Sequence, residues 1–189
     1  MQDNRGLRFT GGDGLEGYER KVHDVLMQTE LNNGYGAYQL SLADRDSGLS
    51  FGGNMDLVKG GRVAQETFMK ILEKAQDRSG NKIIEESEYN KIKAENRVSI
   101  KGQKPEVVFM EMLPRVNAAL SSEYGVQEIN KVYVQELRGK IAHIEKVIAD
   151  LPNKDNRDAL SANEELKVRL IDYHNQFGLS YKGRIRAKL

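Results

Sequence analysis

Three carboxylates in the first quarter of the chain have the residue types needed for acid–base chemistry. Glu16 lies in the segment GLEGYERKVHDVL, residues 14–26, and Asp44 and Asp46 lie in the polar stretch ADRDS, residues 43–47. Hydrolysis of a glycosidic bond needs such a pair, because one carboxylic acid protonates the departing sugar oxygen while a second carboxylate activates water or stabilises charge at the anomeric carbon. We expect Glu16 to be the acid and one of the aspartates to be its partner.

The elements around these carboxylates are a short helix and a hairpin. Residues 14–26 predict a helix that is entered through glycines, with Glu16 near its start. Residues 35–42 and 48–54 read as two short strands joined by the turn 43–47, which predicts a hairpin with two carboxylates at its tip. The remaining candidates lie on these strands and are either groove-lining contacts to sugar or ordinary sheet and core residues: Tyr35, Tyr38, Gln39, Ser50 and Asn54.

Each carboxylate also has a purely structural interpretation. Glu16 fits the first turn of a helix, where the macrodipole stabilises an acidic residue, and aspartates are common in turns. Glu19 follows Glu16 by three residues and competes for the role of acid. We favour Glu16 because its glycine neighbours would let a sugar approach closely, whereas Glu19 followed by Arg20 resembles a solvated ion pair.

The rest of the chain has helical periodicity. Apolar residues recur at three- and four-residue steps near residues 63–75, 85–95 and 105–116, and each of these ranges predicts a helix. The same spacing continues over residues 126–151 and predicts one long helix there. A final helix is expected after Ser161 as its cap. The predicted fold class is α+β and mainly α, as one domain over residues 1–189, with the catalytic helix and hairpin in 1–60 and a helical lobe in 61–189.

Composition excludes several classes of function. The chain has 189 residues, 29 Lys and Arg against 28 Asp and Glu, and a net charge of +1, which argues against nucleic-acid binding by phosphate neutralisation. No apolar run is long enough to span a bilayer, so we expect no membrane insertion. With no cysteine and three scattered histidines, we expect no metal site and no cofactor.

A second motif lies at residues 77–88, DRSGNKIIEESE. Asp77, Ser79, Asn81 and Glu88 occupy positions one, three, five and twelve of a calcium loop of the EF-hand type. Lys82 stands where that loop needs a glycine, and one aspartate among the first three ligands leaves little negative charge. A plain turn between helices is therefore the favoured interpretation, and a calcium-responsive module is the alternative.

Four short segments resemble the lysozyme-like superfamily, which includes phage-type lysozymes, the pesticin type of muramidase and the chitosanases. They are LEG at 15–17, YGAYQ at 35–39, SFGGN at 50–54 and DYHNQFGLS at 172–180. The resemblance implies a lysozyme-like fold with a small antiparallel sheet packed on a helical lobe. It also implies a muramidase that cleaves β-1,4 bonds of peptidoglycan, with Glu16 as acid and Asp44 or Asp46 as second carboxylate.

The resemblance also sets the expected partners and the alternatives. Peptidoglycan or a related polysaccharide is the expected substrate, with an immunity or inhibitor protein as a further partner. A muramidase would act on the bacterial cell wall, in the periplasm or outside the cell. Because the start MQDNRGLRF lacks the apolar core of a signal peptide, we expect the chain to be delivered there by other means or to be processed from a longer secreted protein. The alternatives are chitosan as substrate, or a non-enzymatic interaction or inhibitor protein that docks a partner along the helix 126–151.

Overall fold

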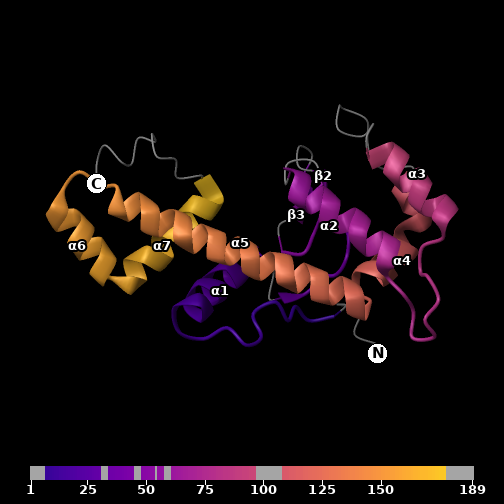
Figure 1. Cartoon of the computed structure of the whole chain (residues 1–189), viewed down its shortest axis with the longest axis horizontal. Coiled ribbons are helices and arrows are strands. Elements are labelled where there is room, and N and C mark those ends of the chain that lie inside the picture. The colour runs from indigo at the N-terminus through magenta and orange to yellow at the C-terminus, as the bar shows by residue number, and fades with distance from the viewer. Residues whose placement is uncertain are drawn as a thin grey trace. The chain divides into compact units, whose positions relative to one another are not determined.

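The computed structural model describes residues 7–30, 34–44, 48–53, 55–57, 61–96 and 108–177. This part of the chain is mainly helical with one small antiparallel sheet, which confirms the predicted class of α+β, mainly α (Figure 1). The elements, in order, are α1 Gly17–Glu30, β1 Ser41–Asp44, β2 Gly48–Phe51, β3 Met55–Asp56, α2 Gly61–Lys74, α3 Glu86–Asn96, α4 Val108–Leu120, α5 Glu123–Ala149, α6 Lys154–Ala162 and α7 Glu164–Phe177. None of the helices in these ranges is long and apolar enough to cross a bilayer.

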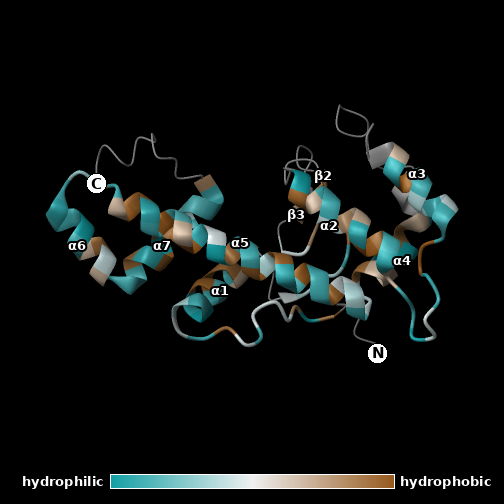
Figure 2. Cartoon of the chain, in the orientation of Figure 1, coloured by the Kyte–Doolittle hydropathy of each residue, from teal (hydrophilic) through white to brown (hydrophobic). Residues whose placement is uncertain are grey.

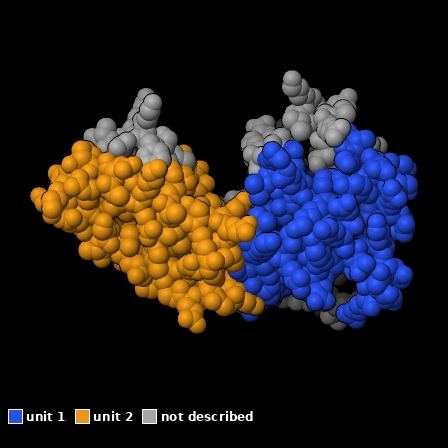
Figure 3. Space-filling view, viewed as in Figure 1, with its two compact units in different colours: residues 1–11, 30–133 blue, residues 12–29, 134–189 orange. Residues whose placement is uncertain are grey.

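The chain forms two compact units (Figure 3). Unit 1 consists of residues 1–11 and 30–133, and unit 2 of residues 12–29 and 134–189. Unit 1 therefore contains the sheet, α2, α3, α4 and the first part of α5, whereas unit 2 contains α1, the rest of α5, α6 and α7. The assignment of residues 1–189 to a single domain stays a prediction.

The sheet of unit 1 has the strand order β1-β2-β3, with both pairs antiparallel. Ser41 faces Ser50, and the register shifts between Leu42 and Asp44, where Asp44 pairs with Gly48. After β2 the chain turns sharply at Gly52, which has a φ of +61° and whose amide donates to the Ala37 carbonyl at 2.6 Å. The positive φ favours glycine at this turn, and a Cβ on Gly52 would also displace the end of the Met55 side chain.

In unit 1, helices α2, α4 and α5 bury several apolar side chains each, whereas α3 buries Ile92 alone among its described side chains. On α2 they are visible as hydrophobic residues that interrupt a hydrophilic helix (Figure 2). Pro114 lies inside α4, and the helix continues through it to Leu120. Phe51 of the sheet and Phe68 of α2 pack with ring centroids 5.6 Å apart. The buried residues of these helices include Ala64, Phe68, Ile71, Leu72, Ile92, Val116, Ala119, Leu120, Ile129 and Val132.

In the part that the structure describes, the regular elements of unit 2 are all helices, joined by short turns. Most of its buried apolar side chains come from α5, α1 and α7 and include Val22, Leu26, Leu137, Ile144, Ile148, Val168 and Ile171, and Leu15 and Leu151 beside these helices are buried as well. Helix α6 contributes no buried residue. Its start is fixed by Asn153, whose side chain accepts hydrogen bonds from the backbone amides of Asp155 and Asn156.

Several predicted elements are confirmed and three need correction. The helices expected near residues 63–75, 85–95 and 126–151 are present as α2, α3 and α5. The strand predicted over 35–42 begins only at Ser41, because Gly36, with a φ of +89°, turns the chain and its carbonyl accepts a hydrogen bond from the Gln39 amide. Two helices follow Pro152 where one was expected, and Ser161 lies inside the first, α6. The residue that caps α7 is Asn163, whose side chain accepts from the Leu166 amide at 3.0 Å.

Candidate functional site

Glu16 directly precedes α1 and has an exposed side chain. Leu15 beside it is buried, and the Leu15 amide donates to the Gly12 carbonyl at 3.1 Å, which fixes the backbone where the helix starts. Gly14 and Gly17 have φ values of +82° and +53°, and a Cβ built on either glycine would meet no atom within 4 Å. The Glu16 carboxylate is thus presented to solvent between two open glycine positions.

Glu19, the competing acid, is held as a carboxylate by Arg138 of α5. The Arg138 Nε donates to Glu19 Oε1 at 2.8 Å and Nη2 to Oε2 at 3.2 Å, a two-point contact within unit 2. The hydrogen bond from Arg138 lowers the pKa of Glu19. The expected pairing with Arg20 was wrong, because Arg20 binds Asp24 one helical turn later, at 2.9 Å. A carboxylate held in this way is a poor proton donor, which agrees with the preference for Glu16.

The two candidate aspartates belong to the hairpin of unit 1. Asp44 is the last residue of β1 and pairs with Gly48 beside the irregularity in the register. Its backbone is placed, but its side chain lies outside what the structure describes, and Asp46 lies outside the described residues altogether. The choice between Asp44 and Asp46 as second carboxylate stays a prediction. The aspartates belong to unit 1, whereas Glu16 belongs to unit 2.

Tyr38 is a core residue in this structure, not an exposed platform for a sugar ring. Its side chain is 2% exposed. Its hydroxyl donates to Asn130 Oδ1 at 2.7 Å, accepts from the Thr10 amide at 2.9 Å and lies 2.9 Å from Thr10 Oγ1. The ring also packs against Phe9, with centroids 5.7 Å apart. A Tyr with a buried hydroxyl needs such partners, and here they tie the N-terminal segment to α5.

Of the other four predicted substrate contacts, three are partly buried and one lies outside the described residues. Tyr35 is half-buried and forms an isolated antiparallel bridge with Arg8, and Gln39 is half-buried in the turn closed by Gly36. Ser50 is half-exposed on the central strand, with its hydroxyl 3.4 Å from that of Ser41. Asn54 lies outside the described residues. Gln39 and Ser50 therefore keep part of their side chains at the surface of unit 1.

Two helical asparagines were missed at the level of sequence and are structurally important. Asn130 of α5 accepts from Tyr38 through Oδ1, and its Nδ2 donates to Thr10 Oγ1 at 2.8 Å. Asn117 of α4 accepts from the backbone amide of Leu40 at 2.8 Å, just before β1 begins. Asn117 lies between Val116 and Ala118, and Asn130 follows Ile129 and lies one helical turn before Tyr133 and Val134, so an amide next to apolar positions was the available signal.

Metal-binding residues do not gather in the part of the chain that is described. There, no three or more His, Cys, Asp or Glu side chains come together as a metal site. His143 of α5 and His174 of α7, which are far apart in sequence, stack with ring centroids 4.4 Å apart and an angle of 24°. Because ring nitrogens bind metals in the ring plane, two stacked faces do not by themselves form such a site.

Known proteins give no further guide to the family. Searches against protein-family models, curated proteins and solved structures each find no match. The functional assignment therefore depends on the chemistry of the chain's own residues.

Proposed function

We propose that the chain is a peptidoglycan-degrading glycoside hydrolase that cleaves β-1,4 glycosidic bonds, with a lysozyme-like fold. Glu16 is the general acid, and Asp44 or Asp46 is the carboxylate that activates water or stabilises the developing positive charge. The support comes from residues in the first third of the chain, where Glu16 lies next to a helix start and Asp44 ends a strand.

The observation that carries the proposal is the setting of Glu16. Its side chain is exposed, its neighbours Gly14 and Gly17 leave open space, and Leu15 anchors the backbone in the core. A polysaccharide can therefore approach this carboxyl group closely from outside. In this role Glu16 gives its proton to the departing sugar oxygen as the glycosidic bond breaks.

The order of the elements supports the same proposal. Helix α1 is followed by a three-stranded antiparallel sheet whose first strand ends at Asp44, and then by helices. The alternative of a helical docking protein required an exposed apolar stripe on the long helix. All of α5 is described, and the large apolar side chains along it are buried or half-buried, so this feature is absent from it.

The test compares three single variants on purified peptidoglycan. Glu16→Gln removes the proton donor, and because the side chain is exposed the fold should persist while lysis is lost. Glu19→Gln is the matched control: it makes the same chemical change three residues away, breaks the contact with Arg138 and should leave lysis close to that of the wild type. Asp13→Asn, another exposed acid before α1, should also retain lysis. Lysis that survives Glu16→Gln would exclude Glu16 as the acid.

Two further variants assign the other carboxylate. Asp44→Asn and Asp46→Asn should differ sharply, with one losing lysis and the other retaining it. The anomeric configuration of the first product then reports the mechanism, since retention requires carboxyl groups about 5–5.5 Å apart and inversion about 6.5–9.5 Å. Release of sugar from chitosan by the same variants distinguishes the two substrate classes.

A further inference from the structure

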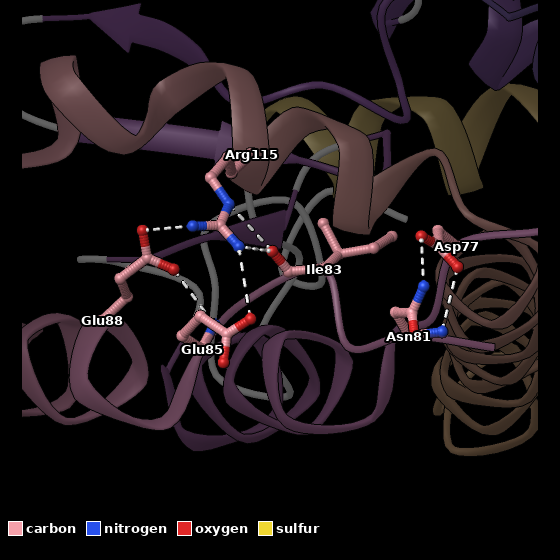
Figure 4. Close-up of polar contacts among 6 residues, drawn as sticks. All are labelled: Asp77, Asn81, Ile83, Glu85, Glu88 and Arg115. Carbon is pink, nitrogen blue, oxygen red and sulfur yellow. Dashed lines mark hydrogen bonds and ion pairs between the residues drawn. The ribbon is translucent and has the colours of Figure 1, made fainter. Parts of the chain in front are cut away.

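The loop between α2 and α3 binds its charged side chains within unit 1 (Figure 4). Asp77 Oδ1 accepts from the backbone amides of Ser79 at 2.8 Å and Asn81 at 2.9 Å, which closes a turn. Apart from this group, Arg115 of α4 donates to Glu88 Oε1 at 2.7 Å. Contacts of this kind build a turn between two helices. A different kind of surface, apolar and exposed, is found on α7.

Helix α7 has two apolar faces. Val168 and Ile171 are buried in unit 2. On the opposite side of the helix, at 100° per residue, four large apolar residues form a second row, here called the α7 stripe: Leu166, Leu170, Tyr173 and Phe177. The exposed fraction is 42% for Leu166, 39% for Tyr173 and 67% for Phe177. A row of large apolar side chains in contact with solvent is a mark of an interaction site, whereas single exposed residues are common.

The α7 stripe has the spacing of a seam between two helices. Its members follow one another at steps of four, three and four residues, which is the pattern that packs one helix along another. Tyr173 and Phe177 are in contact, with ring centroids 4.8 Å apart, so the C-terminal half of the stripe is a continuous apolar surface. From end to end the stripe spans about 16 Å of helix. A surface this long and narrow fits the side of another helix.

A second copy of the chain supplies a helix with a matching stripe. If the two α7 helices run antiparallel, Leu166 of one copy meets Phe177 of the other. Leu170 likewise meets Tyr173, so each leucine packs against a ring, whereas a parallel pair would place ring on ring and leucine on leucine. The antiparallel pair uses the same patch twice and closes on itself. A net charge of +1 gives little repulsion between the two copies.

Charges beside the α7 stripe favour the antiparallel direction. Arg169 flanks the stripe on the same side as Asp172 and Gln176, which are joined by a hydrogen bond of 3.2 Å. In an antiparallel pair, Arg169 of each copy comes next to Asp172 of the other, so the attraction occurs twice. In a parallel pair, Arg169 would come next to His174 instead. Glu165, which lies 2.7 Å from Arg169 within the same copy, stays beside the guanidinium in either case.

We propose that two copies of the chain associate through their α7 stripes as an antiparallel helix pair. The core of unit 2 uses the other face of α7, so association requires no change in the fold. The patch is small, and interfaces that bury less than about 1,200 Å² in total are typical of transient complexes. We therefore expect a weak dimer, with a dissociation constant on the order of 10–100 µM.

The experiment is sedimentation equilibrium of the full chain from about 5 to 500 µM, a range that brackets the expected constant. The average mass should rise from that of one chain, 21.4 kDa, toward twice that value. Tyr173→Ser and Phe177→Ser should each raise the dissociation constant about tenfold or more. The matched control is Val63→Ser, which removes an apolar side chain that is 53% exposed on α2 and should leave the constant unchanged.

A charge reversal tests the direction of the pair. Arg169→Glu should raise the dissociation constant about 3–10-fold, because it places two carboxylates side by side. An equal mixture of Arg169→Glu with Asp172→Arg should associate more tightly than either variant alone. The matched control is Arg62→Glu, which breaks a similar ion pair with Glu66 on α2 and should have no effect.

Three results would overturn the proposal. The first is a mass of one chain at every concentration, as expected if another segment of the same chain covers the stripe. The second is a dimer that Val63→Ser weakens as much as the α7 variants do, or that the α7 variants leave unchanged. The third is wild-type association by Arg169→Glu, which would exclude the antiparallel pair. None of these outcomes depends on peptidoglycan lysis, so this inference and the proposed function fail separately.

Discussion

Replacing Tyr38 with phenylalanine should lower the free energy of unfolding by about 2–3 kcal/mol. The change removes only the hydroxyl, which reaches Asn130 Oδ1 at 2.7 Å and the amide and hydroxyl of Thr10 at 2.9 Å each. A net hydrogen bond contributes about 1 kcal/mol, and a partly buried donor left without its acceptor, here the Thr10 amide, costs about 1–3 kcal/mol. The ring itself stays in place against Phe9.

Urea unfolding followed by far-UV circular dichroism measures this loss. The matched control is Tyr173→Phe, which removes a hydroxyl from an exposed tyrosine of α7 and should change stability by no more than about 0.5 kcal/mol. The double variant with Thr10→Ala should be less destabilised than the sum of the two single variants, since the residues share one network. If Tyr38→Phe lowers the free energy of unfolding by less than about 0.5 kcal/mol, the assignment of Tyr38 to a buried hydrogen-bond network is refuted.

Two further predictions concern pH and the turn after β2. Burial, followed by the charge of Arg20, lowers the pKa of His23 below its ordinary value of 6.5, so the folded chain binds this proton less readily than the unfolded chain. Stability should therefore be full above about pH 6.5 and fall below it, by at most about 1.4 kcal/mol per pH unit, and His23→Gln should flatten the fall measured by urea unfolding at pH 5 and 7. Gly52→Ala should destabilise by about 1–3 kcal/mol, because alanine strains the positive φ and overlaps Met55; a melting temperature equal to that of the wild type would contradict this geometry.

The helical part of the fold could be read from periodicity. Ile129, Leu137, Ile144 and Ile148 recur at the spacing of one helical face and are buried along α5. The first strand could not be read in this way, since alternating residue types at 35–42 look extended. Gly36 instead turns the chain, and the Leu40 amide donates to the Asn117 side chain. The strand therefore begins only at Ser41.

Contacts between residues distant in sequence account for the rest of what was missed. Glu19 was paired with the adjacent Arg20 because local spacing suggested it, but Arg138, more than a hundred residues later, supplies the partner. Tyr38 was left open between a sugar contact and a core residue, and the partner of its hydroxyl, Asn130, lies 92 residues later in the sequence. Arg115 carries no local sign that it would reach the loop at 77–88. Such partners depend on how the helices pack, which a one-dimensional pattern does not contain.

The central claim, that Glu16 donates a proton to a glycosidic oxygen of peptidoglycan, is tested most directly by the products. Purified cell walls are incubated with wild type and with Glu16→Gln, and the soluble fragments are analysed for new sugar reducing ends by mass spectrometry. The wild type should release disaccharide-peptide fragments with new reducing ends, and Glu16→Gln should release none above the background without protein. Equal release by both proteins, or no release by the wild type, would contradict the account.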